Sequence, residues 1–182
     1  MDNSEAIFKA ARQKFLQAYK SLPTVMANEM VNFTKERFRQ QNWLSGGAQP
    51  WKKRKINKDA SRAILRKSGR LARSPRPITK GDMAGIGIDV PYAQVHNDGF
   101  AGIVNVKAHH RNKYGKKKVA SGKFNKNGSE RMKTVTGVTG IGDVKAHTRK
   151  VNIPRRRFVG PSATMMVRLQ KTAQSHFNKF IQ

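Results

Sequence analysis

The sequence contains no cysteine, so disulfide bonds, thiolate nucleophiles and zinc sites with cysteine ligands are excluded. Acidic residues are scarce, with ten Asp and Glu scattered singly along 182 residues. This spacing offers no carboxylate pair for hydrolysis or two-metal catalysis, and we do not expect an enzyme. No apolar run approaches the roughly 18 residues that a membrane span needs. Asp2 and Glu5 stand where a signal peptide requires positive charge, so we expect a protein that stays in the cytoplasm.

Positive charge dominates the composition: 38 Lys and Arg against 10 Asp and Glu give a formal net charge of +28. Hydrophobic residues still make up 37% of the chain, which is enough to oppose disorder throughout. Such a self-repelling chain is tolerated when a polyanion or an acidic partner neutralises it. Nucleic acid, or a protein assembly around nucleic acid, is the expected partner class. A ribosomal-type or membrane-surface protein would share this bulk property.

Helices are predicted at both ends of the chain. Apolar residues recur every three to four positions in residues 4–22, which is typical of an amphipathic helix. Pro23 should end this helix, and Thr24 can cap a second helix that runs toward Trp43. The same periodicity follows Ser162, a suitable N-cap, and predicts a last helix that reaches the C-terminus.

The middle of the chain indicates extended structure. A short helix should end at Ser68 and Gly69, with the glycine as a left-handed C-cap, before Pro75 and Pro77 hold the chain extended. Residues 86–90 alternate as a half-buried strand, and the extended chain should continue beyond them.

A β-hairpin is predicted around the turn signal of residues 97–99, with residues 104–108 as the return strand. Tyr92 and His96 lie four positions apart and would share one face of the extended chain. We expect that face to be buried and both residues to be structural.

Residues 111–143 are rich in Lys, Gly, Asn, Ser and Thr, and predict a long mobile basic loop. The loop is bracketed by a short repeat, residues 106–111 and 144–149, which either places two like strands on its sides or is a chance similarity. Together these elements predict an α+β fold: a small antiparallel sheet packed by N-terminal helices and a C-terminal helix. We expect a helical arm over residues 1–43 and the α+β domain over residues 44–182.

Few residues suggest catalysis or ligand chemistry. His96 and Asp98 could form an acid–base pair, yet the same residues are what a tight turn needs. Three histidines could meet if the repeated strands pair, but we expect no carboxylate nearby, and the surrounding lysines would repel a divalent cation: His109, His110 and His147. Three glycines resemble part of a phosphate loop, but no helix follows them: Gly81, Gly85 and Gly87. We expect no metal and no cofactor.

Clustered basic residues carry the clearest physical signal, because each cluster concentrates charge that pairs with phosphate. The candidate contact residues for DNA or an acidic partner are Lys52, Lys53, Arg54, Lys55, Lys116, Lys117, Lys118, Arg155, Arg156 and Arg157. Aromatic residues are not interleaved with them, which argues against a stacking platform for single strands. Sequence-independent contact with the backbone of double-stranded DNA fits better.

Three motifs, in order, resemble the phage virion morphogenesis, or tail completion, family: Ser68-Gly69-Arg70-Leu71, the segment 90–99 and the segment 153–160. The motif residues that the resemblance marks as structural are Gly69, Leu71, Tyr92, His96, Gly99, Pro154, Phe158 and Gly160. The chain departs from the family pattern where Arg155 and Arg157 flank Arg156, where the family tends to have Ala and Pro, and at Val159, where it has Leu.

The resemblance implies a non-catalytic virion protein of the head–tail junction or tail end, made in the host cytoplasm and used in tail completion or neck assembly. Its implied partners are other virion proteins, such as the portal, neck, tail tube or terminator, and further copies of itself in a homo-oligomer such as a ring around DNA. The alternative is an autonomous nucleic-acid-binding protein without sequence preference.

Overall fold

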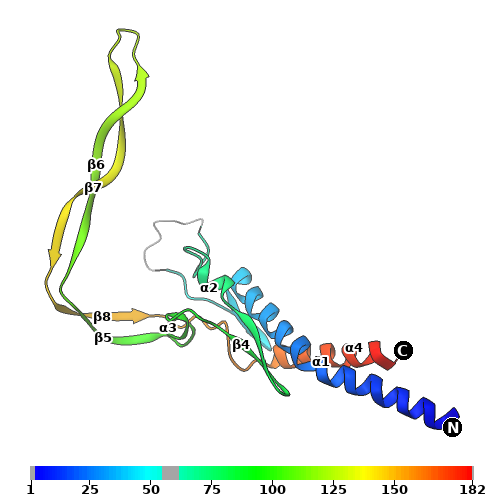
Figure 1. Ribbon diagram of the computed structural model, residues 1–182. Coiled ribbons are helices and arrows are strands. Elements are labelled where there is room, and N and C mark those ends of the chain that lie inside the picture. The colour runs from blue at the N-terminus through cyan, green and yellow to red at the C-terminus, as the bar shows by residue number, and fades with distance from the viewer. Residues whose placement is uncertain (1–2, 55–61, 182) are drawn as a thin grey trace. The chain divides into compact units, whose positions relative to one another are not determined.

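The computed structural model describes residues 3–54 and 62–181 (Figure 1). The chain divides into two compact units, one formed by residues 1–100 and 152–182 and the other by residues 101–151. The α+β class is confirmed, with helices and small antiparallel sheets in one chain. Among the described residues, no helix is long and apolar enough to cross a membrane.

The first helix, α1, is continuous over Asn3–Gln40 and contains Pro23, so the expected break and the second N-cap at Thr24 are wrong. Pro23 has no N–H to give to the preceding turn. In that turn the Ser21 hydroxyl donates to the carbonyl of Gln17 at 3.0 Å and lies 3.1 Å from the carbonyl of Ala18. Pro23 is buried, so packing along this face supports the helix against the local preference of proline.

The last helix, α4, spans Ala163–Ile181, as predicted. The Ser162 hydroxyl accepts the backbone N–H of Met165 at 3.1 Å, which is the expected N-cap hydrogen bond. The helix runs antiparallel to α1 and beside it (Figure 1). Phe177 stacks on Phe15 with ring centroids 5.5 Å apart, and Arg168 meets the later turns of α1.

The first unit contains two short β-hairpins. Strands β1 (Asn42–Ser45) and β2 (Gly47–Pro50) pair around Gly46. Strands β3 (Arg76–Lys80) and β4 (Met83–Gly87) pair around the turn Gly81-Asp82, a two-residue connection that glycine favours. Both β3 and β4 contact α1.

The hairpin expected from residues 86–90 to residues 104–108 does not form, because β3 is the partner of β4. The chain from Tyr92 onward is also not extended, since α3 covers Ala93–Asp98 and ends at Gly99 with φ 80°. Tyr92 and His96 therefore lie one helical turn apart rather than on a strand.

A second correction concerns Gly69. It adopts the left-handed conformation that was expected, with φ 74°, but it precedes the helix α2 (Arg70–Arg73) instead of ending one. Residues 62–69 form turns and bends before it. Ile64 and Leu65, expected in a helix, are partly buried side chains of this irregular segment.

The second unit is made of strands. Strand β5 (Phe100–Val106) pairs with β8 (His147–Ile153), and β6 (His109–Phe124) pairs with β7 (Glu130–Val144) (Figure 1). The irregular loop expected over residues 111–143 is thus an antiparallel hairpin. Its backbone ladder and the β-branched residues of β7 stabilise it without a core, and the tip is held by Asn125 N–H donating to Ser129 O at 2.8 Å. Mobility of this hairpin stays a prediction.

Candidate interaction site

The three sequence motifs converge on one core in the first unit. Leu71 and Phe158 are buried together with Phe38 and Trp51. The Phe38 ring lies 4.8 Å from that of Phe158 and 5.5 Å from that of Trp51, centroid to centroid. Contacts at these distances between aromatic rings add to the free energy gained by burial. The apolar motif residues therefore hold the fold.

Asn97 connects the second motif to the third. Its side-chain oxygen accepts the backbone N–H groups of both Phe158 and Val159, each at 3.0 Å. The carbonyl of His96 accepts the N–H of Arg156 at 2.9 Å. The sequence presented Asn97 only as a turn residue, and its role depends on a segment some sixty positions away.

Gly99 is required where α3 ends because the third motif passes close to it. A Cβ atom at this position would lie 2.9 Å from Arg155 N and 3.1 Å from Ile153 O, and its φ of 80° is costly for other residues. Pro154, between these two neighbours, is partly buried. Gly160, the last glycine of the motif, has φ 145° and precedes the N-cap of α4 by two positions.

The three consecutive arginines divide between interior and surface. Arg156 is only 7% exposed, and its Nε donates to the carbonyl of Lys52 at 3.0 Å. Burial lowers the pKa of the Arg156 guanidinium, and the charge of Arg54 lowers it further. Arg157 lies over the Trp43 ring at 4.9 Å, and Arg155 is exposed. Arg156 was expected at a contact surface, but its guanidinium serves internal packing.

Trp51 closes the same region. Its indole N–H donates to the carbonyl of Arg157 at 2.7 Å, while its own backbone N–H donates to the carbonyl of Gln41 at 2.8 Å. This tryptophan thereby joins the end of α1 to the third motif.

Tyr92 and His96 differ from the expectation that both are buried. The Tyr92 side chain is 43% exposed, and its ring lies edge-on to His96 at 5.9 Å. His96 has a buried Nδ1 with no hydrogen-bond partner among residues 3–54 and 62–181. Burial lowers the pKa of His96, and the charge of Arg156 adds to this effect. Asp98 accepts a hydrogen bond from Asn97 at 2.8 Å, and no hydrogen bond or ion pair between His96 and Asp98 is found in the described part of the chain.

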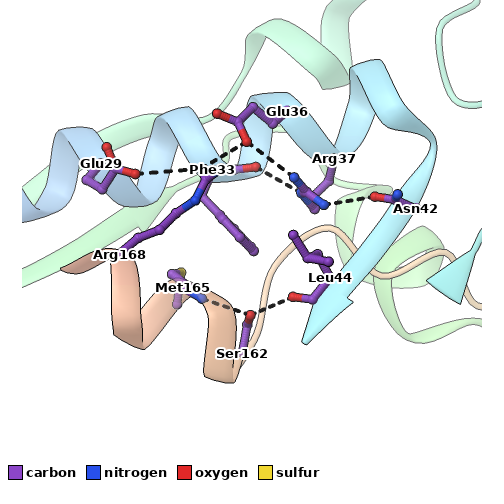
Figure 2. Close-up of polar contacts among 9 residues, drawn as sticks. All are labelled: Glu29, Phe33, Glu36, Arg37, Asn42, Leu44, Ser162, Met165 and Arg168. Atoms are coloured by element: carbon purple, nitrogen blue, oxygen red, sulfur yellow. Dashed lines mark hydrogen bonds and ion pairs between the residues drawn. The ribbon is translucent and has the colours of Figure 1, made fainter. Parts of the chain in front are cut away.

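A polar network fixes α1 against β1 and α4 (Figure 2). Arg37 is fully buried and donates to Asn42 Oδ1 at 2.8 Å, to Glu36 Oε2 at 3.3 Å and to the carbonyl of Phe33 at 3.3 Å. Arg168 of α4 reaches the same Glu36 oxygen at 2.9 Å and lies 3.7 Å from Glu29. Two of the scarce carboxylates are therefore used inside the fold.

Ser162 adds a link between α4 and β1 beside this network (Figure 2). Its hydroxyl donates to the carbonyl of Leu44 at 2.6 Å while it caps the helix. A single hydroxyl thus positions both the start of α4 and the edge of β1.

The remaining basic candidates lie at the surface. Lys52 and Lys53 follow β2 and are exposed, and Arg54 is partly buried. Lys55 lies outside the described residues. Three lysines of β6 belong to the second unit, and all three are exposed: Lys116, Lys117 and Lys118.

The sequence left open whether His109, His110 and His147 meet, although we expected no metal there. No group of three or more potential ligands is found in the described part of the chain. The expectation that no carboxylate lies near these histidines is wrong for His110, because Asp143 on the paired strand lies 2.5 Å from its Nδ1. Both side chains are largely exposed, at 79% and 80%.

The sequence model of the phage virion morphogenesis family matches residues 2–178 of the chain. No curated protein and no solved structure matches it. The match spans the three motifs, α1, the β6–β7 hairpin and α4 up to residue 178. The chain therefore belongs to the phage virion morphogenesis family, and its role is that of a structural or assembly component of a phage virion.

Proposed function

We propose that this protein acts at the head–tail junction or at the tail end, in tail completion or neck assembly. It has no catalytic role in this proposal, and its basic surface faces DNA or acidic virion proteins. Membership of the family supports the assembly role. The observation that carries the finer assignment is the β6–β7 hairpin.

The second unit that contains this hairpin holds thirteen Lys and Arg residues against two acids. Lys116 and Lys118 point to one face of the hairpin and Lys117 to the other, since side chains alternate along a strand. Tyr114 and Phe124 are 68% and 67% exposed. A two-stranded hairpin is marginally stable alone in water, so this unit is suited to contact with a polyanion or an acidic neighbour.

The first half of α1 offers a second surface for assembly. Large apolar side chains are exposed along it, with Phe8 at 75% and Ile7 at 61%. Lys9, Arg12 and Lys14 stand beside them. We assign this face to an acidic virion protein with an apolar centre, because charge complementarity favours such a partner over a second copy of a chain that carries +28.

A homo-oligomeric ring around DNA belongs to the same proposal. The resemblance of the three motifs to the tail completion family implies such a ring, and DNA in the lumen would neutralise the positive field. Candidate contacts are Lys52, Lys53, Arg54, Lys55, Lys116, Lys117, Lys118 and Arg155.

The test is to delete the gene from the phage and to image the particles by electron microscopy. We expect filled heads and tails that do not join, or tails of wrong length, with rescue by the wild-type gene. A K116Q/K117Q/K118Q variant should not rescue, whereas Lys171→Gln on an exposed position of α4 should. Normal infectious particles in the deletion strain would overturn the proposal.

The alternative is an autonomous nucleic-acid-binding protein, which the charge of the second unit also favours. It predicts that the chain is bound to DNA in infected cells and is missing from purified virions. Mass spectrometry of purified virions separates the two proposals.

A further inference from the structure

A pocket of about 360 Å³ opens in the first unit between the irregular segment 62–69 and α3. Arg54, Arg66 and Arg70 line it together with Tyr92 and His96. Its volume lies within the usual range of about 300 to 1,000 Å³ for ligand sites. Neither the basic runs nor the family motifs pointed to a concave site here.

Among the described residues, no carboxylate lines the pocket. Five basic residues line it: Arg54, Arg62, Arg66, Lys67 and Arg70. The side chains of Arg66, Lys67 and Arg70 make no hydrogen bond or ion pair with any other described residue. The same positive field reaches the interior, because Arg54 lowers the pKa of Arg156. An anion in the pocket would relieve the repulsion among Arg66, Lys67 and Arg70, whose charges no described residue neutralises.

The walls of the pocket are fixed to the rest of the unit. The N–H of Ile64 donates to Gln41 Oε1 at 2.9 Å, and the guanidinium of Arg54 donates to the carbonyl of Arg62. Leu65, in the wall, has φ 59°, a conformation uncommon for a leucine. A held, concave arrangement of this kind lowers the entropy cost of binding.

The chemistry of the lining selects the ligand. Guanidinium groups form paired hydrogen bonds with planar carboxylates and with phosphates. Duplex DNA presents its phosphates on a convex surface, which does not enter a pocket, whereas a peptide side chain or chain end does. Leu65, Leu71 and Tyr92 add apolar contact for the body of such a segment.

We propose that this pocket binds an acidic peptide segment of another virion protein, with its carboxylates on Arg66 and Arg70 and its body against Tyr92. The proposal rests on the assembly function proposed above and names the chemistry of one partner. The hairpin lysines then serve a different ligand from the pocket arginines.

The test uses the full chain and a fluorescein-labelled hexaglutamate peptide, followed by fluorescence anisotropy at about 0.15 M salt. A labelled DNA duplex is titrated in parallel. The pocket variant is R66Q/R70Q and the matched control is K116Q/K117Q, which removes the same charge from β6. Circular dichroism and the melting temperature confirm that both variants are folded.

We expect R66Q/R70Q to weaken peptide binding by about tenfold, since hydrogen bonds to charged groups are the strong ones. K116Q/K117Q should leave peptide binding unchanged and weaken DNA binding. Equal loss of peptide binding in both variants would show non-specific attraction and overturn the pocket. If R66Q/R70Q lost only DNA binding, the pocket would be a phosphate site, and the proposal would be overturned. Absence of peptide binding by the wild type would also overturn it. If the chain were missing from virions while the peptide result stood, the assembly function would fail and the pocket would not.

Discussion

His109 and His147 make the same hydrogen-bonding contact at equivalent positions of the internal repeat. Each ring Nδ1 lies 2.9 Å from the carbonyl of the lysine two positions earlier, Lys107 and Lys145 respectively. His109 stands opposite Val144 at the start of the β6–β7 ladder. One copy of the repeat connects β5 to β6, and the other connects β7 to β8. The repeat in the sequence therefore corresponds to two equivalent places in the structure.

The first prediction concerns DNA binding. The purified chain should bind double-stranded DNA without sequence preference, and the affinity should fall steeply with salt as counterions are released. In K116Q/K117Q/K118Q the slope of log affinity against log salt should become shallower by about 0.9 for each phosphate that the variant no longer neutralises. Fluorescence anisotropy with two unrelated duplexes over a salt series measures both effects. Salt-independent binding, or a clear preference for one duplex, would contradict the prediction.

The second prediction is that trypsin cleaves the free protein first within residues 109–144. The strands there are exposed, rich in Lys and Arg, and packed on no core of their own. Peptide mapping of early fragments should place the cuts in the hairpin, and added duplex DNA should slow them. First cleavage within α4, with the hairpin intact, would show that the hairpin is not the least stable part.

The third prediction compares two aromatic truncations. Phe158→Ala should cost about 3–5 kcal/mol of unfolding free energy, because the ring is 1% exposed and packs on Phe38. Tyr92→Ala should cost about 1 kcal/mol or less, because Tyr92 is 43% exposed. Urea unfolding of the two variants provides the comparison. Equal losses would mean that Tyr92 is part of the core.

The fourth prediction isolates a close backbone approach. Gly99→Ala should destabilise the fold more than Gly46→Ala, although their φ values, 80° and 75°, are alike. A Cβ at Gly46 meets nothing within 4 Å, whereas at Gly99 it meets Arg155 N at 2.9 Å. The control should lose only the conformational cost of about 1–2 kcal/mol. The measurement is the difference in urea midpoint between the two variants, at an equal dependence of the unfolding free energy on urea concentration. Equal midpoints would show that the close approach of Arg155 to Gly99 has no steric cost.

The fifth prediction follows from His96, whose pKa is lowered in the fold by burial and then by Arg156. The unfolded chain binds a proton here at a higher pH than the folded chain, near the ordinary value of about 6.5. Stability should therefore fall as the pH drops below about 6.5, until the folded state is protonated as well. His96→Gln should flatten this dependence in urea unfolding at a series of pH values. An identical slope in the variant would mean that another group is responsible.

Local signals in the sequence predicted α4 and its cap at Ser162, because an N-cap hydroxyl and a three-to-four apolar stripe depend on neighbours along the chain. The same rules failed at Pro23, where packing against other elements keeps α1 continuous. They failed again over β6 and β7, because a ladder that covers no core shows little apolar alternation. The hydrogen bond from the Phe158 N–H to Asn97 could not be predicted from the sequence, because local patterns do not show that Phe158 lies beside Asn97.

The basic runs showed where charge is concentrated along the sequence. They did not show whether each basic side chain is buried, lines a pocket or lies on an open surface. Arg156 stands in the middle of a run of three arginines and is buried. Arg66 and Arg70, which belong to no run of three, line a pocket. The pocket depends on the path of the backbone over residues 62–71, where the Ile64 N–H donates to Gln41, and the sequence does not show this path.

The continuity of α1 through Pro23 has a mechanical consequence. At a rise of about 1.5 Å per residue, its 38 residues form a rod about 57 Å long. A break at Pro23 would have been a hinge that absorbs displacement, whereas an unbroken rod transmits it. A partner that tilts the exposed end near Phe8 moves the far end at Phe38, which packs in the core that contains Leu71. Leu71 also lines the basic pocket, so the core at the end of this rod and the wall of the pocket share a side chain.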